Sequence, residues 1–380
     1  MIASRTRAVV VLVCAVVAGA CAADRDDAIQ LGFAAPLSIP IGQSAHRGAV
    51  LAVEEINRSG GIGGRPLELD ARDDQMEREL AIEIATRFRD EGKVVAVIGH
   101  LNSGATIAAA DIYNHPDHGL LEISPAATSP ELSGVGEWTF RVCPTDLQQG
   151  RALADLAYGR LGLRRAAVIY ANDEYGRGVL NAFAPAFEQH GGTVVARDPF
   201  LAAVMEDETT LDPYLERAIL AGADALVIVG VGEEVIDILR AARRLGYRGA
   251  VMGPDGLADL KDAGPIADGV YITSGFLPDR PTEAAQAFVR RFVDRFGEAP
   301  RDGAAHAYDA VMLLARAIRE VGTDRRALRD YIAGVGTVHP AYEGVTGTIR
   351  FDELGDAVGK DVDIGVIRGG QIVTADRTDV

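Results

Sequence analysis

Cysteine, aromatic side chains and positive charge are all scarce in this chain of 380 residues. Two of its three cysteines, Cys14 and Cys21, lie at the start, so Cys143 alone remains in the rest of the chain and an intramolecular disulfide framework is excluded there. We expect Cys143 to be a buried small apolar residue. After the first twenty residues, no apolar run approaches the length that spans a bilayer.

Basic residues are outnumbered by acidic ones. Lysine and arginine number 38 against 55 aspartates and glutamates, which gives a formal net charge of −17. Nucleic-acid binding depends on lysine and arginine placed against phosphate, so a nucleic-acid partner is disfavoured. The acidic balance is typical of a solvated surface that aids solubility. The 48% hydrophobic composition is enough for two domains with their own cores.

Residues 1–20 have the pattern of an export signal. Arg5 and Arg7 precede an apolar stretch over 8–18, and small residues lead to Cys21. A small-small-Cys ending resembles the bacterial lipobox, in which the cysteine becomes lipidated. We therefore predict an exported protein, periplasmic or at the cell surface, that touches the membrane through a lipid on Cys21. Plain secretion is the alternative, because Ala18 stands where a lipobox usually has leucine.

Strand-like and helix-like segments alternate along the rest of the chain. "AIQLGFAAPLS" is typical of a strand and "SAHRGAVLAVEEINRSGGIGG" of a helix, and the same alternation recurs through "VVAVIGH", "AAVIYAND" and "DALVIVG". The apolar strands lack period-two alternation, as expected for strands that are covered on both faces. Repeated β-α-β units predict an α/β fold of two doubly wound parallel-sheet lobes joined by a hinge.

The predicted lobes are not continuous in sequence. The first is expected to comprise residues 28–145 and 276–339, and the second residues 146–275 and 340–380, with a break near Pro144. Two hairpin-like stretches, "GTVHPAYEGVTGTIRFDELGD" and "VDIGVIRGGQIV", are expected to close the second lobe.

Two apolar runs end in residues that carry hydroxyl groups. "VIGHLNSGAT" places Ser103 where a helix begins, and "EISPAATSPEL" places Thr128 before a short helix. In open α/β sheets, ligands collect where strands lead into helix N-termini, whose free N–H groups attract carboxylates. The two stretches therefore favour a single site for a small zwitterion. Each also has a simpler local interpretation, in which its polar residues only cap a helix.

Five motifs follow one another along the chain: "GGIGGRPLEL", "VIGHLNSGAT", "ISPAATSPEL", "NDEYGRG" and "MGPDG". Together they resemble the type I periplasmic binding proteins of the leucine/isoleucine/valine-binding family, which serve ABC importers. The resemblance runs from about Leu31 to Val366. It implies a non-enzymatic protein without cofactor that binds an amino acid, branched-chain or related, and delivers it to a membrane permease.

The resemblance also assigns roles to five residues. It implies that Ser103 binds the ligand carboxylate, that Ala126 and Thr128 offer a carbonyl and a hydroxyl to the head group, that Tyr175 closes from the second lobe, and that Asp255 pairs with the ammonium. Charge-assisted hydrogen bonds of this kind contribute about 1.5–3 kcal/mol. Alternatively, Tyr175 only packs between the lobes and Asp255 is a turn residue.

The pocket wall departs from the family pattern. Ser44 and Val231 stand where the branched-chain binders carry aromatic residues, and Met76 and Asn102 replace a cysteine pair that some relatives have. Smaller groups at Ser44 and Val231 leave room, so an amino acid head group is expected and its side chain remains open.

Two other functions stay open. The same fold also serves receptors for amides, urea or aromatic acids, although an acid at Asp255 favours a cationic ligand group. A nucleotide-dependent oxidoreductase is the alternative of a different class, but its glycine fingerprint is broken after Gly232. We predict no metal site, because Pro116 separates His115 from His118 and spoils a helical metal-binding pair.

Overall fold

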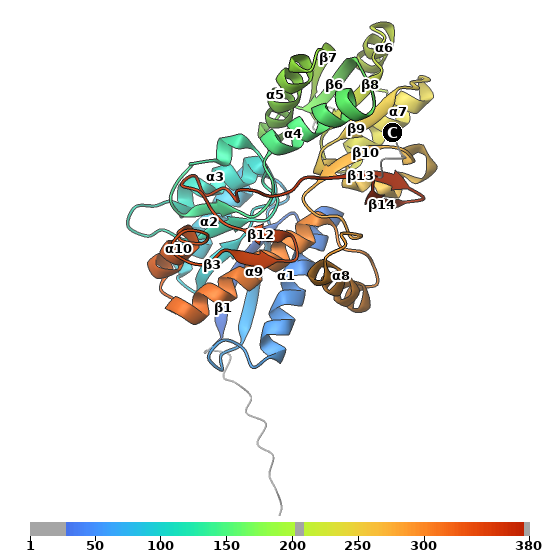
Figure 1. Ribbon diagram of the computed structural model, residues 1–380. Helices are drawn as coiled ribbons and strands as arrows, with labels where there is room; N and C mark the ends of the chain where they lie inside the picture. The colour runs from blue at the N-terminus through green and yellow to red at the C-terminus, as the bar shows by residue number, and fades with distance from the viewer. Residues whose placement is uncertain (1–27, 202–208, 376–380) are drawn as a thin grey trace, which may run out of the picture.

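Two sheets, each with helices on both faces, divide the chain into two lobes (Figure 1). The structure is a computed structural model that describes residues 28–201 and 209–375. Cys21 and the predicted signal at 1–20 lie outside the described residues. Within the described ranges, no helix has the length and apolar character needed to cross a membrane.

The first lobe is built on a wholly parallel five-stranded sheet in the order β2-β1-β3-β4-β5. Apart from the edge strand β2, its strands are nearly all buried, which explains the apolar runs of β1 and β3. The strands are β1 (Ile29–Ala35), β2 (Leu67–Asp73), β3 (Val94–Ile98), β4 (Glu122–Ser124) and β5 (Thr139–Arg141).

Helices cover both faces of this first sheet. One face carries α1 (Pro40–Arg58), α8 (Glu283–Phe296), α9 (Asp302–Val321) and α10 (Arg325–Ala333), and the other carries α2 (Arg78–Glu91) and α3 (Ser103–Tyr113). The lobe also contains the short helix η2 (Pro130–Leu132) and the hairpin of β11 (Tyr342–Gly344) and β12 (Gly347–Ile349).

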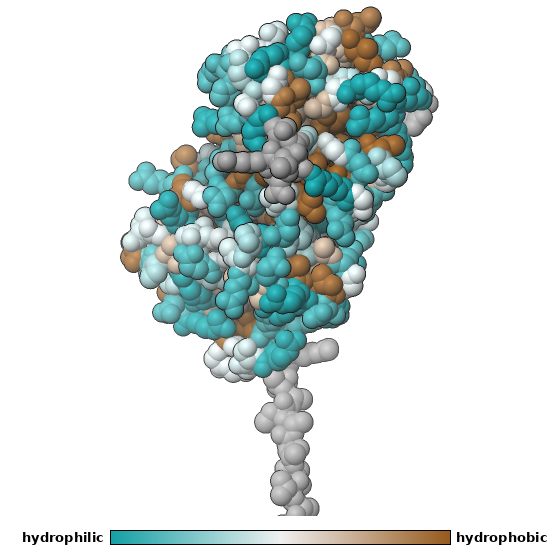
Figure 2. Space-filling view, turned by 45° about the vertical axis from the view of Figure 1, so that its right-hand side comes forward, coloured by the Kyte–Doolittle hydropathy of each residue, from teal (hydrophilic) through white to brown (hydrophobic). Residues whose placement is uncertain are grey.

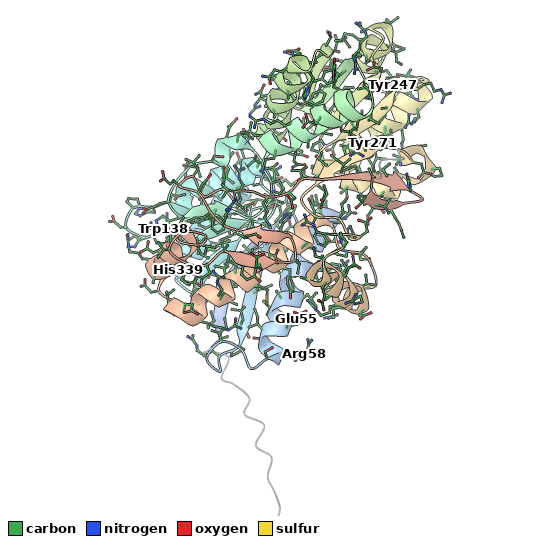
Figure 3. The ribbon with its side chains drawn as sticks, viewed as in Figure 1. Glu55, Arg58, Trp138, Tyr247, Tyr271 and His339 are labelled. Atoms are coloured by element: carbon green, nitrogen blue, oxygen red, sulfur yellow. The ribbon has the colours of Figure 1, made fainter. Side chains whose placement is uncertain are left out.

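Helix α1 lies very close to α9. A side chain on Gly48 would place its Cβ 2.0 Å from the Ala304 carbonyl oxygen, so this approach requires glycine. Farther along α1, Glu55 (labelled in Figure 3) accepts hydrogen bonds from Arg291 Nε at 2.6 Å and from the Tyr308 hydroxyl at 2.7 Å. These contacts hold α1 against α8 and α9 within the first lobe.

The second lobe is built on a seven-stranded sheet in the order β14-β13-β10-β9-β8-β6-β7. It is parallel from β7 to β10, and the last two strands are antiparallel, as the predicted final hairpin requires. The strands are β6 (Arg165–Ala171), β7 (Thr193–Phe200), β8 (Ala225–Val229), β9 (Ala250–Gly253), β10 (Tyr271–Ser274), β13 (Asp363–Arg368) and β14 (Gln371–Thr374).

Helices also cover both faces of the second sheet. One face carries α4 (Asp146–Ala154), its continuation η3 (Asp155–Arg160) and α5 (Glu174–Gln189). The other carries α6 (Asp212–Leu220), α7 (Glu233–Arg244) and η5 (Asp255–Ala267). The fold class predicted from the sequence, two doubly wound lobes, is confirmed.

Three segments cross between the lobes: between β5 and α4, between β10 and α8, and between Ala357 and β13 (Figure 1). Pro144 lies in the first of them, as predicted. Cys143, next to it, is a buried free cysteine whose Sγ donates to the Ala127 carbonyl at 3.6 Å, and burial raises the pKa of its thiol. The expectation that Cys143 is a buried packing residue is confirmed.

The predicted boundary at residue 340 is wrong. Ile349, Phe351 and Ala357 pack in the core of the first lobe, and Phe351 lies edge-on to Phe140 with ring centroids 5.1 Å apart. The stretch from 340 to 357 therefore belongs to the first lobe, and only the second hairpin closes the second lobe. The turn residues around 340 indicated a change of direction but not a change of lobe.

Hydrophilic residues cover most of the face shown in Figure 2, and the hydrophobic ones are scattered among them in small groups. Such a surface agrees with the excess of acidic residues in the composition.

Candidate ligand-binding site

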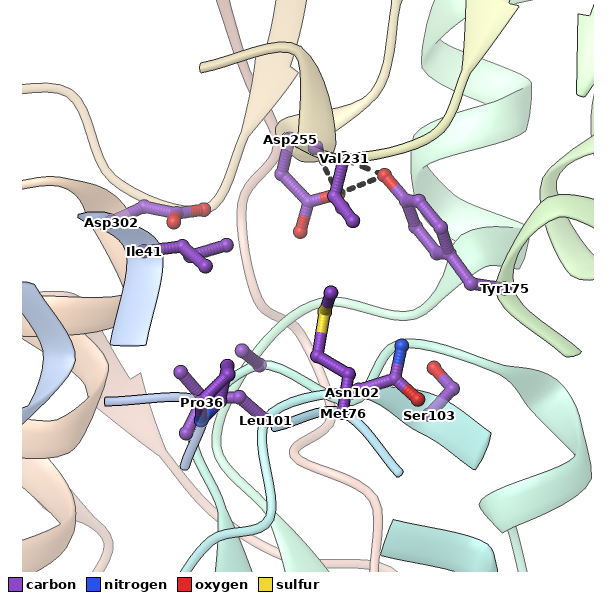
Figure 4. Close-up of a pocket in the computed structure, with 12 residues that line it drawn as sticks. Pro36, Ile41, Met76, Leu101, Asn102, Ser103, Tyr175, Val231, Asp255 and Asp302 are labelled. Atoms are coloured by element: carbon purple, nitrogen blue, oxygen red, sulfur yellow. Dashed lines mark hydrogen bonds between the residues drawn. The ribbon is translucent and has the colours of Figure 1, made fainter. Parts of the chain in front are cut away.

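A cavity lies between the lobes, at the carboxyl ends of the parallel strands of both sheets, where α/β folds collect ligands (Figure 4). Its volume is about 50 Å³. The first lobe contributes Pro36, Ile41, Met76, Leu101, Asn102, Ser103, Ala126 and Asp302, and the second lobe contributes Tyr175, Val231, Asp255 and Gly256.

Ser103 is the first residue of α3, directly after the loop that follows β3. Asn102 is the N-cap, and its side chain accepts from the Ala105 amide at 3.2 Å. The helix cap is therefore Asn102, and the Ser103 hydroxyl, which accepts from the Ser129 amide at 3.3 Å, keeps its proton to donate. The backbone N–H groups of Ser103 and Gly104 lie in the first turn and have no carbonyl partner within the helix, so this end of α3 attracts anions.

The second hydroxyl-bearing stretch is held in place by a buried arginine. Arg141, at the end of β5, is 1% exposed and donates from Nη1 to the carbonyl oxygens of Ser129 at 2.7 Å and Ala127 at 3.3 Å. Its Nε donates to Asp356 at 2.7 Å. Ala126 reaches the cavity from this stretch. Thr128 is 1% exposed and does not line the cavity, although its backbone carbonyl fixes the start of α4 by accepting from the Asp146 amide at 2.9 Å.

The wall from the second lobe centres on a hydrogen-bonded pair. The Tyr175 hydroxyl donates to Asp255 Oδ1 at 2.7 Å and accepts from the Gly256 amide at 3.0 Å (Figure 4). Behind them, Gln149 accepts from the Asp255 amide at 3.1 Å. Burial raises the pKa of Asp255, and the hydrogen bond from the Tyr175 hydroxyl acts against that rise. A cation that binds against this carboxylate would therefore stabilise its ionised form.

Most of the predicted site residues meet in one place. Ser103, Ala126, Tyr175 and Asp255 all line the cavity, together with Asn102 and Val231 of the predicted pocket wall.

The prediction that Ser44 forms part of the wall is wrong. Helix α1 begins at Pro40, one turn earlier than the sequence pattern indicated, so Ser44 lies one turn inside the helix and not at its exposed start. There Ser44 is 3% exposed, and its hydroxyl accepts from the Arg301 amide at 3.3 Å. Ile41, from the added turn, lines the cavity in its place.

Sequence reasoning missed several lining residues. Pro36 directly follows β1 and Leu101 follows β3, so the rule that ligands lie at carboxyl strand ends could have found them. Asp302, in contrast, begins α9 far from the other motifs. Nothing near it in the sequence indicates that it faces the second lobe.

Ion pairs join the lobes at two places beside the cavity. Arg78, at the start of α2, pairs with Glu174 at the start of α5. Arg301 of the first lobe pairs with Asp259 at 2.6 Å and with Asp262 at 3.0 Å, both on η5 of the second. Both contacts exist only while the lobes are close together, so they favour the closed arrangement.

We expect Glu174→Gln to shift the protein toward an open arrangement and to weaken ligand binding by up to about fivefold, since a partly exposed ion pair contributes about 0.2–1 kcal/mol. X-ray scattering measures the opening as a larger radius of gyration, and calorimetry measures the affinity.

Glu188→Gln is the matched control, because Glu188 pairs with Arg197 inside the second lobe at 2.7 Å. If Glu174→Gln binds and scatters as Glu188→Gln does, the Arg78–Glu174 pair does not hold the lobes together.

Two doubly wound lobes, three crossings and a cavity between them define a type I solute-binding protein. The profile of the periplasmic binding protein family matches residues 28–371, and the chain belongs to this family, on its leucine/isoleucine/valine-binding branch.

The relatives agree with this assignment. The Leu/Ile/Val-binding protein homolog 1 of Brucella suis is 29% identical over 335 residues, which cover 86% of this chain and 87% of that protein. The Leu/Ile/Val-binding protein of Escherichia coli K12 is 32% identical over 252 residues, 64% of this chain and 67% of that protein. A crystal structure of LivJ from Streptococcus pneumoniae in complex with isoleucine has a TM-score of 0.83 at 28% identity, covering 92% of this chain and 99% of that one.

Proposed function

We propose that this protein is the extracytoplasmic solute-binding component of an ABC importer, that it binds an amino acid between its lobes, and that it delivers the ligand to a membrane permease. It acts as a carrier without catalysis, and a lipid on Cys21 tethers it to the membrane. The observation that carries the proposal is the cavity to which one lobe contributes Ser103 and Ala126 and the other contributes Tyr175 and Asp255.

The two walls differ in charge, as a zwitterion requires. On the first lobe, the Ser103 hydroxyl and the helix end of α3 offer donors to a carboxylate. On the second lobe, Asp255 offers a negative charge to an ammonium group, and Tyr175 orients it. The ligand bridges both walls, so its binding favours lobe closure by contacts that the open form lacks.

A thermal-shift screen of the mature protein against the common amino acids tests this function. A ligand at a hundredfold excess over its dissociation constant is expected to stabilise the protein by about 2.7 kcal/mol. Urea, acetamide and benzoate serve as comparison compounds, because urea and acetamide carry no charge and benzoate has a carboxylate without an ammonium group. A response to one of these compounds and to no amino acid would overturn the proposal.

A further inference from the structure

Two carboxylates, rather than one, face the cavity. Asp255 begins η5 on the second lobe and Asp302 begins α9 on the first, and both point into the space between the lobes (Figure 4). The Ser274 hydroxyl donates to Asp302 at 3.3 Å, but its stronger bond goes to the Phe276 carbonyl at 2.8 Å. The backbone amides of Gly275 and Gly303 also donate to the Asp302 carboxylate, so the carboxylate has hydrogen-bond donors around it and lacks only a positively charged partner.

The lining of the first cavity offers these carboxylates no cation. None of the twelve residues around the cavity, all of them in the described part of the chain, is lysine, arginine or histidine. The nearby Arg301 is engaged by Asp259 and Asp262. Burial and the charge of Asp255 together raise the pKa of Asp302 to about 7, as expected for a carboxylate without a positive partner.

A neutral amino acid leaves Asp302 either protonated or as a buried charge without a partner. Its carboxylate would lie against the start of α3 and its ammonium against Asp255, which leaves Asp302 without a partner. A ligand with one more positive group removes the imbalance, because a buried carboxylate is costly unless it is paired.

The structure also has room beyond the two carboxylates. A second cavity of about 360 Å³ shares Asp255 and Asp302 with the first and continues toward the segment between β10 and α8. Phe276 and Leu277 line it there, and Lys261 and Arg301 are also among its lining residues, so a cationic group of the ligand is favoured beside the two carboxylates and not deeper in this cavity. The first cavity alone measures about 50 Å³. A side chain that extends past Asp302 therefore enters open space.

From these observations we propose that Asp302 determines specificity, and that the ligand is an amino acid with a second cationic group on a long side chain, held between Asp302 and Asp255. The inference rests on the proposed function and deepens it. Asp302 would act on the side chain, whereas Asp255 would act mainly on the head group.

Calorimetric titration with lysine and norleucine tests the inference, because norleucine has the same carbon chain without the terminal ammonium. The wild-type protein is expected to bind lysine at least about tenfold more tightly than norleucine, since a charge-assisted hydrogen bond is lost. Asp302→Asn keeps an acceptor for Ser274 and is expected to lower lysine affinity about tenfold while norleucine affinity stays within about twofold.

Asp294→Asn is the control variant, because Asp294 is exposed on α8 and does not line either cavity. Thermal melting of the variants without ligand checks that they fold. The comparison of lysine with norleucine in the wild-type protein does not depend on any variant. Tighter binding of norleucine or leucine than of lysine would overturn the inference and leave the proposed function intact. Failure of every amino acid to bind would instead overturn the proposed function.

Discussion

Asp255→Asn is expected to raise the dissociation constant for the amino acid ligand by about 10- to 150-fold, which corresponds to a charge-assisted hydrogen bond of about 1.5–3 kcal/mol. The asparagine keeps an oxygen that can accept from Tyr175 and Gly256, so the local structure is expected to persist. Calorimetric titration with the amino acid that gives the largest thermal shift measures the loss.

The same carboxylate makes binding sensitive to acid. Asp255 must be ionised to pair with an ammonium, and burial raises its pKa. As the pH is lowered, affinity is therefore expected to begin falling at a higher pH than it would with an ordinary aspartate. Asp255→Asn is expected to remove the part of this pH dependence that Asp255 causes and to leave the part that Asp302 causes.

Asp237→Asn is the control for this experiment, because Asp237 pairs with Arg240 on the outer side of the second lobe at 2.9 Å. Wild-type affinity in Asp255→Asn would remove Asp255 from the site. A melting temperature that stays near the wild-type value without ligand would show that any loss of binding comes from the site and not from unfolding.

Arg141→Met is expected to cause the largest loss of stability, about 3–5 kcal/mol in the free energy of unfolding, because it leaves Asp356 without its buried partner. It also frees the carbonyls of Ala127 and Ser129, which hold the stretch that brings Ala126 to the cavity. Ligand binding is therefore expected to weaken as well. Urea denaturation, followed by circular dichroism, gives the change in free energy.

Arg240→Met is the matched comparison, since Arg240 forms a partly exposed pair and its loss is expected to cost less than about 1 kcal/mol. If both variants lose the same small amount, Arg141 does not organise the loop. In that case, adding Asp356→Asn to Arg141→Met would leave the free energy of unfolding unchanged. If the loss comes from the unpaired Asp356, the double variant is expected to be more stable than Arg141→Met alone.

Much of the fold could be predicted because local sequence patterns determine it. Buried parallel strands produce apolar runs, and glycines and caps end the helices between them, so the alternation and the two lobes follow from the sequence. Ser103 and Asp255 could be placed at the cleft because each begins a helix shortly after a strand. The motifs of the family then distinguished them from ordinary caps and turns.

What could not be predicted depends on contacts between distant segments. Ser44 was misplaced because α1 begins one turn earlier, at Pro40, which puts Ser44 about 5 Å farther along the helix axis, away from the cleft. Asp302 and the Arg78–Glu174 pair depend on how the lobes meet, and neither has a local signal. The boundary at 340 failed because Ile349 and Phe351 pack back on the first lobe after a turn.

The three crossings have a consequence for the order in which the protein can fold. The first sheet lacks the cover of α9 until residue 321 has been synthesised, and the second sheet lacks β13 and β14 until residue 374. Domains that are continuous in sequence can fold one after another as a chain emerges from the ribosome. Here, in contrast, neither lobe can be completed until residues in the C-terminal part of the chain have been synthesised. The lobes of such a chain stay incomplete for most of its synthesis, which would suit the export that we propose for it.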